Sequence, residues 1–367
     1  MKVGILTFHR AHNYGAVLQC YALSKTLQSL GYDVEIIDYY PTYFKEEYSS
    51  FSINRFRKLS LVSKLSYIFS FLRNARIKRK HCLVFDKFIN DLPLSSCQYT
   101  EYSLPPQGYD CIFFGSDQIW NPLLTKGEDK MFSGNFKVEG TSLIAYAAST
   151  NPSLCTNEYR EYFSGIISRF KYISTREKSL CCYLNEIQPS CGRVVLDPVL
   201  LLNEEKWTEI AVEPKIKDYL LIYTVPQSDK VWELANLIAK EKGLEIVEVR
   251  PNANKVNNKK GKGTILKVVS PNEFLGYFLH ASYVVTTSFH GTAFSVKFQK
   301  EFVTLSLGGS IDDRAVNLLS SIGLSDRMIS HENLYSPSTA IDYNKVNMKL
   351  EIMIKDSINY IDLATRR

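Results

Sequence analysis

Three segments place polar side chains where a short apolar run gives way to a helical pattern. They are residues 9–15 (HRAHNYG), 174–177 (STRE) and 286–292 (TTSFHGT). Backbone N–H groups at such a helix start, together with the helix dipole, favour an anion or a sugar hydroxyl. A first-turn histidine such as His290 binds an anion or transfers a proton near neutral pH. The plainer interpretations are a helix capped by Asn13 and a histidine bonded to the backbone.

Two arginines extend this chemistry. Arg176 lies in the second segment, and Arg314 lies in the last helix expected of the second half. An arginine in a cleft suits bidentate recognition of a carboxylate or phosphate, although most arginines are surface salt-bridge partners. Residues 9–15 lack both the G-x-G-x-x-G and the P-loop spacing, which argues against a dinucleotide or nucleoside triphosphate. Asp197 is expected to be a structural cap.

A fourth segment, residues 115–122 (GSDQIWNP), follows a buried strand. It carries a carboxylate at Asp117, amides at Gln118 and Asn121, and the indole of Trp120. Sugar sites use such planar polar groups for hydroxyls and an aromatic ring for the apolar sugar face. The alternative is a capped turn with the tryptophan in the core.

The elements around these segments alternate between strand and helix. Residues 3–8 are an apolar run, residues 16–30 carry apolar side chains near a 3.6-residue period as far as Gly31, and residues 34–39 form a second run. This β-α-β opening favours parallel strands. Further strands are expected at 110–114, 143–148, 172–174, 194–196, 219–225, 245–249, 265–269, 283–287 and 302–307, with helices at 158–170, 176–184, 229–242, 270–280, 288–298 and 313–322.

This order predicts an α/β fold of two Rossmann-like, doubly wound domains facing across a cleft. We expect an N-terminal domain of residues 1–200 with a helical basic insertion at about 41–106, and a C-terminal domain of residues 201–340. Residues 341–367 are expected to hold a C-terminal helix. Doubly wound sheets bind ligands outside the carboxyl ends of their strands, where the four segments lie.

Composition excludes several classes of protein. The 367 residues are 45% hydrophobic and include 20 Phe and 23 Tyr, too much apolar surface for a disordered chain. No apolar run reaches the roughly 18–20 residues of a membrane span, and the start of the chain does not resemble a signal peptide. The eight cysteines show no C-x-x-C pair, so we expect reduced thiols, no metal site and a cytoplasmic protein.

In combination, five segments resemble the polysaccharide pyruvyl transferase family. They are residues 13–19, 115–122, 174–177, 196–198 and 287–291, in the family's order. The resemblance implies a GT-B-like architecture whose last helix crosses back to the first domain. It also implies transfer of the enolpyruvyl group of phosphoenolpyruvate to two hydroxyls of a sugar, which forms a cyclic pyruvate ketal and releases phosphate, with no other cofactor.

The resemblance also suggests roles for individual residues. His290 matches the family's motif histidine and is our candidate acid for the methylene carbon. Arg176 matches a family arginine that holds the donor. Some members have a second arginine where this chain has Ser288, so either Arg314, Lys297 or the basic loop 255–262 replaces it, or the donor itself differs. The donor set is completed by Gly291 and Thr292, and the expected acceptor residues are Asn13, Tyr14, Gly15, Asp117, Trp120 and Asn121.

Positive charge is concentrated in residues 55–80, which hold nine Lys or Arg and no acid although the whole chain carries only +6. With the apolar residues between them they form either an insertion docked on the first domain or an amphipathic surface that meets anionic lipid at the inner membrane. Nucleic acid is not expected, because no recognised module accompanies the charge.

The sequence thus predicts a cytoplasmic enzyme of capsule or exopolysaccharide assembly that pyruvylates a sugar on a nucleotide-linked or lipid-linked precursor. The alternatives are a GT-B glycosyltransferase that uses a nucleotide sugar and a carbohydrate-binding relative without turnover.

Overall fold

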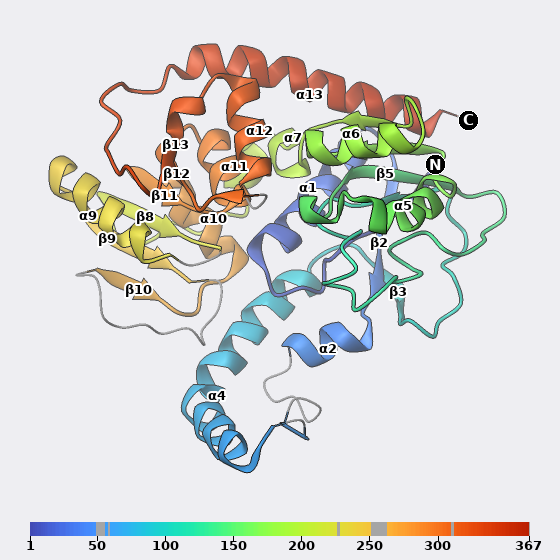
Figure 1. Cartoon of the computed structure of the whole chain (residues 1–367), viewed down its shortest axis with the longest axis horizontal. Helices are drawn as coiled ribbons and strands as arrows, with labels where there is room; N and C mark the ends of the chain where they lie inside the picture. The colour runs from blue at the N-terminus through green and yellow to red at the C-terminus, as the bar shows by residue number, and fades with distance from the viewer. Residues whose placement is uncertain (49–55, 58, 226–227, 251–262, 310–311, 367) are drawn as a thin grey trace.

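The computed structural model describes residues 1–48, 56–57, 59–225, 228–250, 263–309 and 312–366, with the backbone alone at 61–62 and 65–73. Two lobes lie side by side, and the last helix runs along both of them (Figure 1). Within the described residues, no helix is long and apolar enough to span a bilayer.

The N-terminal lobe is built on a seven-stranded sheet in the order β3-β2-β1-β4-β5-β6-β7. Every neighbouring pair is parallel. The order reverses between β1 and β4, as in a doubly wound Rossmann sheet. The strands are β1 (Lys2–Leu6), β2 (Asp33–Tyr39), β3 (Leu94–Tyr99), β4 (Cys111–Phe114), β5 (Ser142–Ala148), β6 (Tyr172–Thr175) and β7 (Gly192–Val194).

Helix α1 (Tyr14–Ser29) occupies the centre of this lobe. It begins where Asn13 Oδ1 accepts the N–H of Ala16 at 3.2 Å, and the chain turns at Gly31 with φ 86°. Almost all of its residues are buried, because it is covered by the sheet, by α7 and by the other lobe. The other helices of this part are α2 (Thr42–Tyr48), α4 (Leu61–Asn90), α5 (Arg160–Ile167), α6 (Lys178–Ile187) and α7 (Pro198–Leu201).

The C-terminal lobe repeats the plan with a six-stranded sheet in the order β10-β9-β8-β11-β12-β13, again all parallel. Its strands are β8 (Tyr219–Tyr223), β9 (Glu245–Val249), β10 (Thr264–Leu266), β11 (Tyr283–Thr286), β12 (Glu301–Ser306) and β13 (Met328–Ser330). Its helices are α8 (Glu204–Thr208), α9 (Asp229–Lys242), α10 (Pro271–Leu279), α11 (Phe289–Lys297), α12 (Asp313–Ile322) and α13 (Tyr343–Thr365). The predicted pair of Rossmann-like domains in a GT-B-like arrangement is therefore confirmed.

Two strands were not predicted, and one long helix lies in the insertion that was expected to be helical. β3 lies in the expected insertion at 41–106, where it extends the first sheet, and β13 forms the edge of the second sheet. α4 spans 30 residues of the same insertion and projects from the body as an arm (Figure 1). Its apolar side chains at 61–62 and 65–73 lie outside the described residues.

The lobes are joined by aromatic packing and by α13. Tyr14 stacks on Phe274 of α10 with ring centroids 4.3 Å apart, and its hydroxyl donates to the carbonyl of Val269. At its two ends α13 contacts both lobes: Tyr343 donates to the carbonyl of Lys300, and Tyr360 donates to the carbonyl of Ala145 in β5. These contacts bring the carboxyl ends of the two sheets toward each other.

Candidate functional site

Six charged or titratable side chains meet between the lobes, and we call them the interlobe cluster. They come from the loops and helix starts that follow β4, β6, β7, β11 and β12. Each is therefore positioned at a carboxyl end of a parallel sheet, where doubly wound folds bind ligands. Its members are Asp117, Arg176, Glu177, Asp197, His290 and Arg314.

Arg176 is the centre of the cluster, and its side chain is only 1% exposed. Its Nε donates to Glu177 Oε1 at 3.2 Å. One terminal nitrogen faces Asp197 at 2.8 Å and Ser116 at 3.4 Å, and the other faces Asp117 and Ser149, each at 3.3 Å. A guanidinium has five N–H groups, and here there are five acceptors for them. A donor anion at Arg176 would have to displace one.

Asp197 has two roles, one for each carboxylate oxygen. Oδ1 accepts the N–H of Val199 at 3.1 Å and so caps α7, as predicted. Oδ2 accepts from Arg176 and, at 2.9 Å, from Ser116. Burial alone would raise the pKa of this carboxyl, but His290 and Arg176 hold it well below its usual range. Asp197 therefore presents a permanent negative charge.

His290 enters the cluster from the first turn of α11. Its Nε2 lies 3.7 Å from Asp197 Oδ2, within ion-pair range but too far for a hydrogen bond. This nitrogen is buried, and none of the described residues offers it a hydrogen-bond partner. Arg176 and His290, from different lobes, thus approach the same carboxylate oxygen.

Arg314, from α12, is the second guanidinium of the cluster. Its Nε lies 4.0 Å from Glu177 Oε1, and in the described part of the chain this buried nitrogen has no hydrogen-bond partner. The Phe289 ring lies near both arginines, whose guanidinium carbons are 5.1 Å (Arg176) and 5.9 Å (Arg314) from its centre. Burial and the nearby Arg176 lower the pKa of Arg314. Unlike Arg176, this arginine has N–H groups to spare.

Three other predicted donor residues lie around the start of α11. Ser288 occupies the N-cap position, and over the described residues its side chain makes no capping bond. Thr292 is fully buried and bonds inward to Ser288 and Thr304. Gly291 was expected to admit a ligand, but a Cβ there would lie 2.2 Å from Thr286 Oγ1. The glycine thus serves close packing of α11 on β11, and ligand access at Gly291 stays a prediction.

Of the predicted acceptor residues, three lie inside the protein. Tyr14 and Trp120 are 0% exposed: the first joins the lobes, and the second packs edge-on against Phe170. Asn121 donates to Gln118 and accepts the N–H of Leu123, so it stabilises its own turn. Both aromatic rings, Tyr14 and Trp120, are thus packed inside the protein and present no exposed face to a sugar.

The remaining acceptor candidates border the cluster. Asp117 is 18% exposed and faces Arg176. Gly15 lies directly against the His290 ring, and Asn13 caps α1. Among the described acceptor candidates, Asp117 therefore has a side chain that is partly exposed and also contacts Arg176 in the cluster.

Other polar groups of the sequence motifs point elsewhere. His9 and Arg10 both bind Asp38, and His12 binds Asp86 of α4 at 3.0 Å. Lys297, at the far end of α11, donates to the carbonyl of Leu200. The loop 255–262 lies outside the described residues. Of the cations expected to replace the missing family arginine, Arg314 is the described one that lies in the interlobe cluster.

Sequence reasoning gave no role to Glu177. Its carboxyl accepts from Ser149 and Arg176, and its side chain is 1% exposed. The string STRE placed it beside Arg176, but the direction of a side chain at the start of α6 depends on the tertiary fold. Within the described ranges, no group of three or more His, Cys, Asp or Glu is arranged to hold a metal ion.

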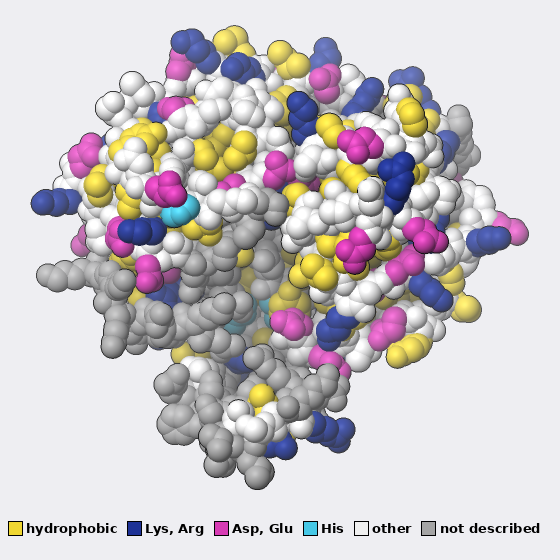
Figure 2. Space-filling view, viewed as in Figure 1, with side chains coloured by type: hydrophobic (Ala, Val, Ile, Leu, Met, Phe, Trp, Pro, Cys, Tyr) yellow, Lys and Arg dark blue, Asp and Glu magenta, His cyan; other side chains and the backbone are white. Residues whose placement is uncertain are grey.

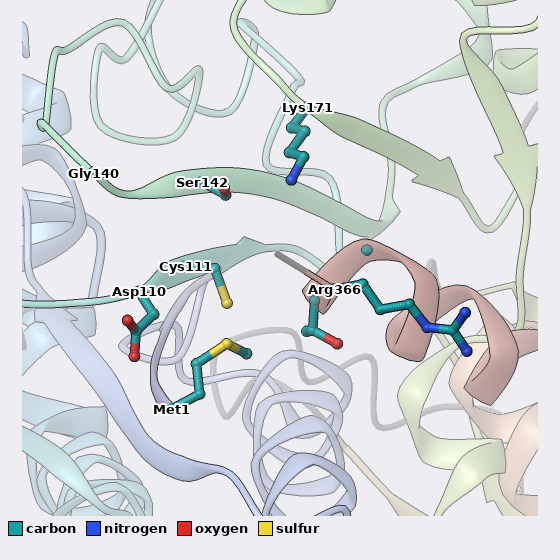
Figure 3. A pocket seen from close by; sticks show the side chains of 9 residues that line it. Met1, Asp110, Cys111, Gly140, Ser142, Lys171 and Arg366 are labelled. Atoms are coloured by element: carbon teal, nitrogen blue, oxygen red, sulfur yellow. The ribbon is translucent and has the colours of Figure 1, made fainter.

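A cavity of about 340 Å³ lies at the opposite, amino-terminal end of the first sheet. Figure 3 shows that Cys111 and Asp110 line it beside β4 and that Lys171 points into it from above. It contains no member of the interlobe cluster, so it is separate from the candidate site.

Several solved structures are similar to this chain in overall arrangement. UDP-GlcNAc 2-epimerase of Methanocaldococcus jannaschii is 12% identical, with a TM-score of 0.46 over 96% of this chain and 93% of that one. The Neisseria meningitidis enzyme bound to UDP-GlcNAc is 9% identical, with a TM-score of 0.48 over 99% and 94%. Arabidopsis thaliana UGT89C1, complexed with UDP-L-rhamnose, is 10% identical, with a TM-score of 0.48 over 99% and 98%. No significant match is found among curated proteins.

The family model for polysaccharide pyruvyl transferase matches residues 13–309. That range begins at the cap of α1 and contains all of the interlobe cluster except Arg314. Because the match covers most of the chain and contains the motifs that meet between the lobes, the chain belongs to the polysaccharide pyruvyl transferase family.

Proposed function

We propose that the protein transfers the enolpyruvyl group of phosphoenolpyruvate to two hydroxyls of one sugar in a surface-polysaccharide precursor. The observation that carries the proposal is the approach of His290 and Arg176, from different lobes, to Asp197, at 3.7 Å and 2.8 Å. Such an arrangement joins an acid-base group to a fixed charge network at a cleft between domains.

The donor is held by Arg314 and the start of α11. Phosphoenolpyruvate carries a carboxylate and a phosphate, and both suit a guanidinium with free N–H groups. Since, over the described residues, the Ser288 side chain does not cap α11, the start of this helix adds backbone N–H donors and a positive dipole end. Arg176, with all its N–H groups engaged, positions Asp117, Glu177 and Asp197 instead.

His290 supplies the proton in the first step. A proton moves from its ring to the methylene carbon of the donor, and the first sugar hydroxyl bonds to the neighbouring carbon and loses its own proton. The C–O bond to phosphate then breaks, and the second hydroxyl closes the ketal. The proton of the first hydroxyl returns to the His290 ring and that of the second hydroxyl leaves with the phosphate, so the reaction needs no further reactant.

Asp117 contacts the acceptor in this proposal. Its carboxylate is the most exposed of the three in the cluster and accepts hydrogen bonds from sugar hydroxyls. The acceptor is a sugar on a nucleotide-linked or lipid-linked precursor.

The test is phosphate release from phosphoenolpyruvate with a panel of galactosyl and N-acetylmannosaminyl acceptors, with the product identified by mass spectrometry. We expect acceptor-dependent phosphate release and a ketal product. Nucleoside diphosphate binding without use of phosphoenolpyruvate would instead favour a glycosyltransferase. Glycan binding without phosphate release would favour a binding protein.

The arm formed by α4 is proposed to meet anionic lipid. Arg76, Arg79 and Lys80 are exposed on it, and Figure 2 shows basic side chains at the lower end of the molecule. Liposome flotation with and without acidic lipid tests this contact. Salt-sensitive flotation with acidic lipid supports it, and equal recovery with neutral lipid contradicts it.

A further inference from the structure

Glu177 is a buried carboxyl whose two oxygens have different surroundings. Oε1 accepts from Ser149 Oγ and from Arg176 Nε at 3.2 Å, and Arg314 Nε lies 4.0 Å away. Oε2 is buried, and among the described residues it has no hydrogen-bond partner. A buried polar atom without a partner carries a free-energy penalty, which a ligand group or a proton with its acceptor can remove.

The pKa values of Glu177 and Asp197 shift in opposite directions, although both carboxyls are buried against Arg176. Burial raises the pKa of Glu177 above its usual value, even though Arg176, Arg314 and Ser149 oppose the shift. The pKa of Asp197 is lowered instead, because His290 acts on it as well as Arg176 and the two outweigh the effect of burial. Glu177 is therefore the carboxyl of the pair that gains a proton more easily.

The charge balance of the cluster favours proton uptake once the donor is bound. The three carboxylates, Asp117, Glu177 and Asp197, are balanced by two guanidiniums and by the His290 ring when it carries its proton. A donor with a carboxylate and a phosphate adds more negative charge at Arg314. Because Glu177 Oε1 lies 4.0 Å from Arg314 Nε, a donor bound at this arginine places its negative charge close to the Glu177 carboxyl.

We propose that Glu177 binds a proton when the donor binds, and that this frees Arg314 from its ion pair to hold the donor. The inference rests on the proposed function, because it takes phosphoenolpyruvate as the donor. The proton comes from water and returns to water when phosphate leaves, so the step consumes nothing.

The charged neighbours of Glu177 come from several elements. Arg176 adjoins it in the chain, and α12 contributes Arg314 and Asp313, the latter bonded to Ser179 of α6. Cys155 lies nearby, but burial and then Glu177 raise its thiol pKa to about 11, so it stays neutral at physiological pH. Asp117 and Asp197 act on Glu177 through Arg176, which they share.

Isothermal titration with phosphoenolpyruvate alone tests the proposal. Binding is measured at several pH values from 5 to 9, each in buffers of different ionisation enthalpy, which gives the number of protons taken up. We expect the wild type to take up more protons than Glu177→Gln, by up to about one per site at the maximum. Glu186→Gln, an exposed change on the same helix, should match the wild type.

A second variant should shift the pH at which proton uptake is greatest without abolishing the uptake. Ser149→Ala removes a hydrogen bond that stabilises the ionised carboxyl, so the maximum of uptake should move to higher pH. If Glu177→Gln does not fold, Ser149→Ala decides alone, and an unchanged maximum overturns the proposal. Equal uptake by wild type and a folded Glu177→Gln also overturns it. Absence of donor binding to the wild type overturns the proposed function and this inference together.

Discussion

The ring of His290 fills the space that a side chain at position 15 would need. A Cβ added to Gly15 would lie 2.1 Å from His290 Nδ1, a distance that no pair of non-bonded atoms tolerates. Gly15 belongs to the first turn of α1 and His290 to the first turn of α11, so two helix starts from different lobes meet at this contact. The lack of a side chain at Gly15, in the NYG motif, thus leaves the space that the His290 ring occupies.

Gly15→Ala should therefore displace His290 and loosen the contact between the lobes. We expect a loss of about 1–3 kcal/mol in the free energy of unfolding, typical of overpacking, and a larger fractional loss of phosphate release. Gly192→Ala is the matched control, because a Cβ there would be 3.6 Å from its nearest neighbours. Equal unfolding curves for Gly15→Ala and the wild type would contradict this packing role.

His290→Gln should abolish most turnover while leaving the fold intact. General acid catalysis contributes about 10²–10⁴ in rate, so the acceptor-dependent kcat should fall by that factor. The exposed His280 provides a control, and His280→Gln should retain the wild-type rate. Retention of more than about a tenth of the wild-type kcat in His290→Gln would exclude the role of the acid.

The elements with clear caps and periods could be predicted closely from the sequence. α9 and β9 have the predicted bounds, since Gly243 ends the helix in the left-handed region with φ 67° and a short apolar strand follows. β3 could not be predicted, because its side chains are exposed or only half-buried and show no apolar run. β13 is a three-residue edge strand, which leaves too short a pattern.

The candidate site was predictable in location more than in detail. The ends of buried strands identified Asp117, Arg176 and His290 as neighbours of the cleft. The local pattern cannot tell which way a polar side chain turns, so the saturation of Arg176 and the burial of Glu177 became apparent only in three dimensions. Trp120 and Tyr14 illustrate the same limit, since an aromatic residue beside a site serves the core equally well.

Arg176→Gln should affect stability before it affects donor binding. It would leave the buried Asp197 and Glu177 without their shared cation, and removing one partner of a buried ion pair typically costs about 3–5 kcal/mol. Urea unfolding measures this loss. Arg169→Gln, which breaks a partly exposed pair with Glu128, should cost much less.

The His12–Asp86 pair should make stability depend on pH in the alkaline range. Burial alone would lower the pKa of His12, but hydrogen bonds with Asp86 and Cys82 raise it from 6.5 to about 9. The charged pair thus contributes its full stability below about pH 6.5 and loses it as the pH rises through about 9.

Urea unfolding of Asp86→Asn measures that contribution between pH 6 and pH 10. The variant should be less stable than the wild type at pH 6, and the difference should shrink toward pH 10. Asp91→Asn, at the exposed end of the same helix, should show no such pH dependence. A difference that stays constant across this range would contradict the raised pKa of His12.

Arg314→Gln distinguishes the two guanidiniums of the cluster. Because Arg314 is 19% exposed and its Nε lacks a hydrogen-bond partner among the described residues, its loss should affect stability little. A charge-assisted hydrogen bond contributes about 1.5–3 kcal/mol, so the Kd for phosphoenolpyruvate should rise roughly tenfold to a hundredfold. Arg193→Gln, an exposed change in β7, should leave the Kd unchanged. If the Kd is unaltered in Arg314→Gln but rises in a folded Arg176→Lys, then Arg176 contacts the donor directly and its carboxylate partners must give way when the donor binds.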